Sequence, residues 1–214
     1  MSLHVPTIPR VMLLAFDTSS SACTAALFDG SGACVARKDE LIGRGHSERL
    51  VPMLDELLQG LRCDRILVGV GPGSFTGIRV AIAAAHGLAI GWDAELSGMS
   101  SLALLAAGAS TEDEVGVAII GGHGELFAQQ FDGKTGEPKA ELRNVAPSDA
   151  AELITAPMVI GSGARALVDA RSWGEAREAW PSAANALKIR LALRSLLPKP
   201  VYARAPDAKV REAA

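Results

Sequence analysis

The sequence predicts an α/β fold in which aliphatic helices pack against buried sheets. Hydrophobic residues make up 49% of the chain but aromatic residues only 4%, so the core must consist mainly of Ala, Leu, Val and Ile. Strand patterns followed by helix patterns occur twice, with a seam near residues 98–113. The 214 residues suffice to remove roughly 70% of the extended surface from water. We therefore expect two α/β halves with a core of their own.

The first half predicts three adjacent strands and then alternating helices and strands. An apolar run ends at Asp17, and two more apolar stretches flank the turn residues 29–32. Residues 43–61 predict an amphipathic helix, interrupted or kinked at Pro52, with leucines at helical spacing: Leu50, Leu54, Leu57 and Leu61. Strands are expected at 64–71 and 94–96, and helices at 75–90 and 100–107. This order implies parallel neighbours joined by right-handed crossovers.

The second half repeats this order in shorter elements. Residues 114–146 predict a strand meander, followed by a helix at 148–154, a strand at 157–161 and a helix at 162–170. Residues 184–197 predict a last helix. Arg190 and Arg194 would lie on one face of it, and Ala186, Ile189, Leu193 and Leu196 would form an apolar face.

Cysteine spacing and hydropathy argue against several classes of protein. Cys23, Cys34 and Cys63 form no C-x-x-C pair, which disfavours a disulfide framework or a cysteine zinc site and favours a reducing, cytoplasmic compartment. The longest nearly uninterrupted apolar run spans 11 residues, against about 20 for a membrane crossing. Pro6 and Pro9 interrupt the N-terminal segment, so we expect neither a signal peptide nor a membrane partner.

Charge is unevenly distributed along the chain. The net charge is −3, but the segment from Asn185 to the end carries seven basic and two acidic residues, so this tail is +5 and the remainder −8. A basic tail on an acidic body is typical of a contact with nucleic acid or an acidic protein. The alternative is a solvated helix face followed by a frayed end.

The densest glycine cluster, GVGPGSFTG at residues 69–77, precedes an apolar helix. It is not a Walker loop, because Ile78 and Arg79 follow Gly77 where Lys and Ser or Thr are required. It departs from a dinucleotide-binding fingerprint at Thr76, which takes the place of the third glycine. The simpler interpretation is a tight turn with Ser74 as the helix N-cap, whose free N–H groups could still attract an anion.

The helix after this turn is apolar on nearly all sides. Between residues 77 and 90 only Arg79 and His86 are polar, and their spacing of seven places them on one narrow face. Gly77, Ala81, Ala84 and Leu88 recur at spacings of three or four residues along this helix. The three small residues among them permit another helix to pack closely. Two interpretations follow: an internal helix covered by the helix of residues 43–61, or a helix bundle shared with another protein.

Few residues suggest catalysis or ligand binding. Asp17 with the hydroxyls of Thr18 and Ser19 could hold a phosphate, whereas a capped strand-to-hairpin turn would need no ligand. The spacing of the four histidines, His4, His46, His86 and His123, matches no metal-binding motif. His123 and Glu125 lie in the turn 121–125 and are more typical of a surface pair. We therefore assign no catalytic or metal-binding residue, and Asp17, Thr18 and Ser19 stay as a candidate for a phosphate site.

Five segments together resemble the TsaB (YeaZ) family: LLAFDTSSSACTAALFD, HSERLVPMLDELL, GVGPGSFTGIRVAIAAAHGLA, SGMSSLALLA and PVYARAPDAK. This resemblance implies an actin-like ASKHA (ribonuclease H-like) fold of two lobes, each a mixed sheet flanked by helices, at residues 1–100 and 101–214. The first lobe would carry the partner-binding helices and the smaller second lobe the basic tail.

The resemblance also implies a non-catalytic partner subunit in the transfer of threonylcarbamoyl to N6 of adenosine 37 of tRNA. It would bind TsaD as a heterodimer, self-associate when isolated, work with the ATPase TsaE, and meet tRNA through the complex. It would have no cofactor of its own, with ATP or ADP and metal in the partner subunits. The interface would comprise residues of both helices: Leu50, Met53, Leu54, Leu57, Phe75, Thr76, Ile78, Arg79, Ala81, Ile82, Ala84 and Ala85.

Two departures qualify this assignment. Ser101 and Leu105 stand where the catalytic relative carries the two metal-binding histidines of H-x-E-G-H, and neither replaces a metal-bound imidazole. Residues 120–125 read IGGHGE instead of the Asp-Ala-Arg common in TsaB proteins. Alternatives from other classes are an ATP-dependent phosphotransferase of this fold using Asp17, a metal-dependent glycoprotease-like peptidase, and a dinucleotide-binding domain.

Overall fold

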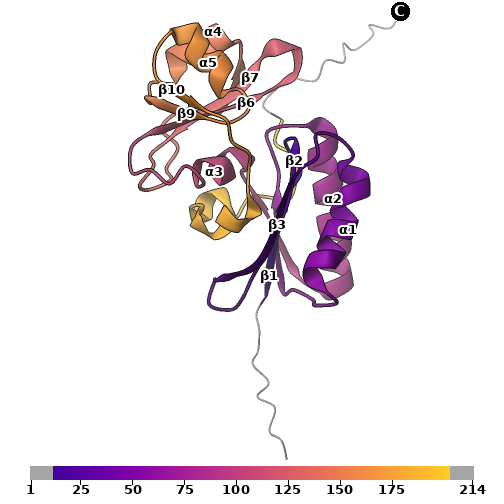
Figure 1. Cartoon of the computed structure of the whole chain (residues 1–214). Helices are drawn as coiled ribbons and strands as arrows, with labels where there is room; N and C mark the ends of the chain where they lie inside the picture. The colour runs from indigo at the N-terminus through magenta and orange to yellow at the C-terminus, as the bar shows by residue number, and fades with distance from the viewer. Residues whose placement is uncertain (1–11, 203–214) are drawn as a thin grey trace, which may run out of the picture.

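The computed structural model describes residues 12–202 and consists of two lobes, each built on a five-stranded mixed sheet (Figure 1). This arrangement confirms the predicted α/β class and the repeated order of strands and helices. The described part of the chain ends beside the first lobe, not in the second (Figure 1).

The first sheet has the strand order β3-β2-β1-β4-β5. Its strands are β1 (Leu13–Asp17), β2 (Ala22–Phe28), β3 (Cys34–Leu41), β4 (Arg65–Gly69) and β5 (Glu95–Met99). β1 pairs antiparallel with β2 and parallel with β4, so the carboxyl ends of β1 and β4 lie together. β1 and β2 are buried throughout because both faces of the sheet are covered, whereas the edge strand β3 alternates between exposed and half-buried residues.

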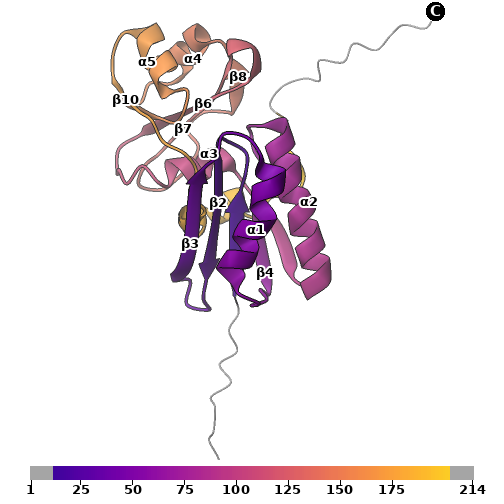
Figure 2. The same ribbon diagram turned by 45° about the vertical axis from the view of Figure 1, so that its right-hand side comes forward.

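Two helices, α1 (His46–Leu58) and α2 (Phe75–Trp92), lie side by side on one face of this sheet (Figure 2). Pro52 lies inside α1, which continues past it, so the helix does not restart there. Ser74 is the N-cap of α2, as predicted, because its hydroxyl accepts a hydrogen bond from the N–H of Gly77 at 3.2 Å. Among the described helices, α2 alone has the length and mean hydropathy of a membrane span, and one of its faces packs on the sheet.

The second sheet has the order β10-β9-β6-β7-β8. Its strands are β6 (Val115–Ile120), β7 (Leu126–Phe131), β8 (Arg143–Val145), β9 (Met158–Ile160) and β10 (Glu175–Arg177), with a 3-10 turn, η1 (Gly122–Gly124), between β6 and β7. Helices α4 (Pro147–Leu153) and α5 (Ala164–Arg171) cover its outer face. Helix α3 (Ser101–Ala106) packs against β6 and β7 on the other side.

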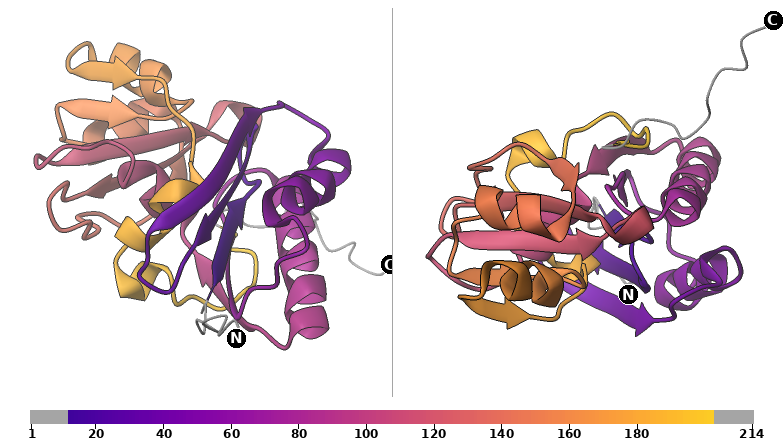
Figure 3. Two further views of the ribbon diagram at one scale, coloured as in Figure 1. Left: turned by 60° about the horizontal axis from the view of Figure 1, so that its bottom comes forward. Right: turned by 90° about the horizontal axis from the view of Figure 1, so that it is seen from above.

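The two sheets share one continuous hydrophobic cluster, in which α3 and the turns near the C-terminus lie between the lobes (Figure 3). Leu13 and Phe28 of the first sheet, Leu102 and Leu104 of α3, and Val117 of the second sheet all belong to it. The lobes are therefore packed against each other through shared apolar side chains, not merely tethered.

The predicted helix at 184–197 is wrong. The chain there forms two 3-10 turns, η2 (Ala183–Lys188) and η3 (Leu191–Leu193), with extended backbone at Ile189 and Arg190 between them. The apolar side chains contact different parts of the core, because Ala186 and Ile189 fill the interlobe cluster while Leu196 packs against the core cluster of the first lobe. A straight helix could not reach both.

The segment that follows also returns to the first lobe. Leu196 exchanges backbone hydrogen bonds with Gly98 at the edge of β5, and the Val201 N–H donates to Val70 O at 2.8 Å. This differs from the expected assignment of residues 101–214 to a single second lobe.

Candidate partner-docking surface

The turn between β1 and β2 is locked onto the glycine-rich loop at the carboxyl ends of β1 and β4. The Asp17 carboxylate accepts hydrogen bonds from the N–H and hydroxyl of Ser19, both at 2.7 Å, and from the hydroxyl of Ser101. The Thr18 hydroxyl donates to Gly77 O at 2.6 Å, and the Ser74 N–H donates to Ser19 O at 2.6 Å. The polar groups of this turn thus find their partners within the chain.

Glycine is required in this loop because backbone approaches backbone. A Cβ added at Gly77 would lie 1.9 Å from Thr18 O, and one at Gly73 would lie 2.0 Å from Ser19 O. Gly73 also has φ of 151°, which side chains rarely adopt. The glycines therefore allow the loop to contact the β1–β2 turn. In a phosphate-binding loop, glycines instead allow the backbone to approach a ligand.

This geometry bears on the predicted phosphate site. Asp17, Thr18 and Ser19 are all buried, at no more than 1% exposure, and are hydrogen-bonded to one another or to the loop. Such burial favours the capped-turn interpretation, since a phosphate would need the same hydroxyls and N–H groups facing a cleft.

The predicted partner interface is divided between core and surface. Eight of its residues pack inside the first lobe and cannot line a surface: Leu50, Met53, Leu54, Leu57, Ile78, Ala81, Ile82 and Ala85. Phe75, Thr76 and Arg79 are exposed, and Ala84 is half-buried. The residue set is corrected accordingly, because the sheet below takes the side of each helix that is richest in large aliphatic residues.

The side of α2 turned away from the sheet remains exposed, and it combines apolar residues with a threonine, an arginine and a histidine. We call it the α2 outer face, defined by residues three or four apart: Phe75, Thr76, Arg79, Ala83, His86, Gly87 and Ile90. Phe75 and Ile90 are 60% and 83% exposed, and Val51 of α1 is 62% exposed. Residues 12–202 therefore leave this side of the helix uncovered.

Two glycines on this exposed side have open space around them in the part of the chain that the structure describes. A Cβ added at Gly87 or Gly91 would meet nothing within 4 Å. Each glycine in a helix interior costs about 1 kcal/mol relative to alanine. Small residues at this spacing permit another helix to approach closely.

A stacked cluster lies at the N-terminal end of the outer face. The Arg79 guanidinium carbon lies 3.3 Å from the ring centroid of Phe75 and 5.6 Å from that of Tyr202, and the two rings are 6.0 Å apart. Sequence reasoning did not assign Tyr202, Gly87 or Ile90 to the site. The PVYARAPDAK motif contains Tyr202, but its position against α2 is a tertiary contact that no local pattern shows.

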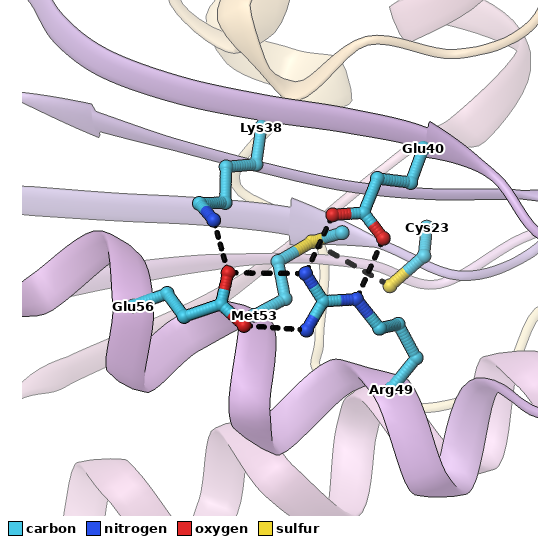
Figure 4. Close-up of polar contacts among 6 residues, drawn as sticks. All are labelled: Cys23, Lys38, Glu40, Arg49, Met53 and Glu56. Atoms are coloured by element: carbon cyan, nitrogen blue, oxygen red, sulfur yellow. Dashed lines mark hydrogen bonds and ion pairs between the residues drawn. The ribbon is translucent and has the colours of Figure 1, made fainter.

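Helix α1 is joined to strand β3 by a network of ion pairs (Figure 4). Arg49 donates two hydrogen bonds to Glu40, at 2.5 and 2.6 Å, and two to Glu56, at 2.8 and 3.1 Å. Lys38 also pairs with Glu56. Hydrogen bonds from Arg49 and then Lys38 lower the pKa of Glu56 to about 2, and Arg49 likewise lowers that of Glu40. Beneath the network, burial first and then the charge of Glu40 raise the pKa of the Cys23 thiol to about 11.

Other predicted positions serve structural contacts. The Ser101 hydroxyl donates to Asp17 and accepts from the Gly71 N–H at 3.2 Å, while Leu105 is buried between the lobes. In the turn 121–125, His123 has φ of 60° and the Asn144 amide donates to Glu125. Within residues 12–202, no three His, Cys, Asp or Glu side chains are grouped to hold a metal ion.

Comparison with known proteins places the chain in a family. The model of TsaD, tRNA N6-adenosine threonylcarbamoyltransferase, matches residues 39–156, more than half of the chain. The chain belongs to the TsaD family. It is 43% identical over 103 residues to the tRNA threonylcarbamoyladenosine biosynthesis protein TsaB from Haemophilus influenzae. It is 35% identical over 128 residues to the protein of the same name from Escherichia coli. These alignments cover 45% and 56% of this chain.

The aligned stretches span 42% and 54% of those relatives, so the chain matches about half the length of each. The structural similarity is wider. YeaZ from Pseudomonas aeruginosa superposes with a TM-score of 0.73 and 29% identity, covering 89% of this chain and 99% of that one. These findings confirm the resemblance to TsaB and YeaZ and the two-lobed fold.

Proposed function

We propose that this TsaD-family chain is the non-catalytic partner subunit in threonylcarbamoyladenosine formation on tRNA, and that it binds a TsaD-type transferase through the α2 outer face and the adjoining Val51. The observation that carries the proposal is an 18-residue apolar helix, one side of which the described residues leave exposed. Removing Phe75, Ile90 and Val51 from water would stabilise a complex by about 25 cal/mol per Å² of apolar surface. The names of the TsaB relatives supply the pathway.

The division of labour is part of the same proposal. Ser101 holds Asp17 and the glycine loop at the position where the catalytic relative would carry a metal-binding histidine, so this position serves the fold. Transfer of the threonylcarbamoyl group, with its ATP or ADP and metal, would belong to TsaD and to the ATPase TsaE. The subunit would act in the cytoplasm, meet tRNA only within the complex, and pair with a second copy when isolated.

The phosphotransferase alternative is less well supported. It requires Asp17 and the hydroxyls after it to face a nucleotide, whereas they are buried and hydrogen-bonded within the chain. No contact described here favours the peptidase or dinucleotide alternatives within residues 12–202.

Binding of the purified chain to the TsaD of the same organism tests the proposal. Gly87→Leu and Ile90→Arg are expected to weaken the complex at least about 30-fold, as substitutions at the centre of an interface do. Both sites have open space or high exposure, so neither variant should melt below the wild type, and Gly87→Leu should melt slightly above it because it removes a glycine from a helix interior. Leu153→Arg on α4, at 44% exposure, is the matched control. A wild-type chain that does not bind TsaD would contradict the proposal.

A further inference from the structure

Arg79 stacks on two aromatic rings and has no carboxylate partner among the described residues, whereas six of the twelve described arginines pair with one. Arg49, Arg143 and Arg177 each pair with glutamate at 2.9 Å or less. Arg79 is exposed on the second turn of α2, and among the described residues no hydrogen bond or ion pair engages its guanidinium. Its contacts are with aromatic rings: Phe75 and Tyr202.

These rings fix the guanidinium in one orientation. Phe75 lies one turn earlier on α2, and its ring centroid is 3.3 Å from the Arg79 guanidinium carbon. Tyr202 is held by the C-terminal segment, which the hydrogen bond from Val201 to Val70 fastens to the first lobe. A guanidinium stacked in this way keeps its N–H groups in the plane of the group, pointing away from the rings, so little side-chain entropy remains to be lost when it binds.

The surroundings of Arg79 make this cation distinctive. Residues 75–92 contain no aspartate or glutamate, and the other titratable side chain on the outer face is His86. On α1, Glu56 is already engaged by Arg49 and Lys38, and Glu48 accepts from the Ser47 hydroxyl. Asp55, the third acidic residue of α1, is exposed and forms no ion pair with Arg79 in the described structure. The outer face is thus an apolar surface with one stacked cation that lacks an anion.

We infer that the partner helix seated on the α2 outer face carries an aspartate or glutamate that pairs with Arg79, and that Phe75 and Tyr202 hold Arg79 ready for it. This inference rests on the proposed docking function and adds the chemistry that selects the partner. The planar fork of arginine binds both oxygens of a carboxylate, and the apolar surround would shield the pair from water. The C-terminal segment, through Tyr202, becomes part of the docking surface.

Affinity measurements on single variants test this inference. Arg79→Met keeps the length and apolar stem of the side chain but removes its charge, and the affinity for the TsaD partner is expected to fall about 30-fold. Arg79→Lys is expected to recover only part of that loss, because lysine lacks the fork and the stacked plane. Tyr202→Leu is expected to weaken binding about threefold to tenfold by freeing Arg79. Arg62→Met is the matched control, an exposed arginine in the loop before β4.

Three readouts separate failure of this inference from failure of the docking proposal. If the wild-type chain binds and Arg79→Met equals Arg62→Met in affinity, docking stands and the carboxylate pairing is overturned. As the salt concentration rises, the wild-type affinity is expected to fall more steeply than that of Arg79→Met. Equal dependence of the two affinities on salt would also overturn the carboxylate pairing. Loss of self-association in Arg79→Met with unchanged TsaD affinity would assign the pairing to a second copy of this chain and overturn it as well.

Replacement of the partner's carboxylate gives a direct check. Arg79→Glu alone is expected to abolish binding. Each aspartate or glutamate on the interface helices of the partner is then changed to lysine, one at a time, and each partner variant is mixed with the Arg79→Glu chain. Restored affinity in one such pair supports the inference, and no restoration in any pair contradicts it.

Discussion

Gly77 and Gly87 lie in one helix and show how differently the same residue type is used. At Gly77 a side chain would collide with Thr18 O, so the backbone of the β1–β2 turn excludes any Cβ. At Gly87 a side chain would meet nothing within 4 Å among residues 12–202. The first glycine is required by the fold, and the second fits the proposed approach of another helix.

Alanine at these two glycines is expected to change stability in opposite directions. Gly77→Ala should lower the free energy of unfolding by about 2–3 kcal/mol, since a buried backbone contact must shift. Gly87→Ala, in an exposed helix interior, should raise it by about 0.5–1 kcal/mol. Urea denaturation of both variants measures this, and equal effects would contradict the role assigned to Gly77.

At the scale of elements, the position of α1 depends on both its core side and its surface side. Leu50, Met53 and Leu54 bury one side against the sheet. Arg49 fastens the other side to β3 through Glu40 and Glu56 (Figure 4). Salt screens such surface pairs and they contribute modestly to stability, but several sharing one arginine define how the helix lies.

The arginine network predicts a specific dependence of stability on pH. The pKa of Glu56 is about 2 in the folded chain and 4.5 without its partners, so its stabilising contribution is complete above pH 4.5 and is lost as the pH falls towards 2. In Arg49→Met, urea midpoints measured between pH 7 and 2.5 should therefore decline less steeply across this window. The same decline in wild type and Arg49→Met would refute the assignment, and Arg62→Met serves as the control.

At the scale of the whole molecule, α3 and η2 make the two lobes one unit. They place their apolar residues in a cluster that also contains side chains of both sheets. Opening the lobes would expose this cluster to water, at about 25 cal/mol per Å² of apolar surface. The fold therefore favours a rigid body that presents α2, and disfavours a hinge that closes around a ligand.

Cooperative unfolding of both lobes follows from the shared cluster. Variants retaining only Trp92, in the first lobe, or only Trp173, in the second, should report the same urea midpoint by fluorescence. Leu104→Ala should lower both midpoints together and cost about 2–5 kcal/mol, because Leu104 is fully buried between the lobes. Two separate transitions would show that the lobes fold independently.

Sequence alone determined the order of the strands and helices as far as α5, the Ser74 cap and the apolar character of α2, because periodicity and capping are local properties of the chain. It did not predict the short strand β10. It also determined the family through motifs such as GPGSFTG. Only the tertiary structure decided which side of each helix the sheet would bury, which moved Leu50 and Ile78 into the core and left Gly87 and Ile90 outside. It likewise decided that residues 184–197 bend between the lobes and that Tyr202 stacks beside Arg79. The physical reason is that burial and long-range contact depend on the packing of segments far apart in sequence, which no local pattern records.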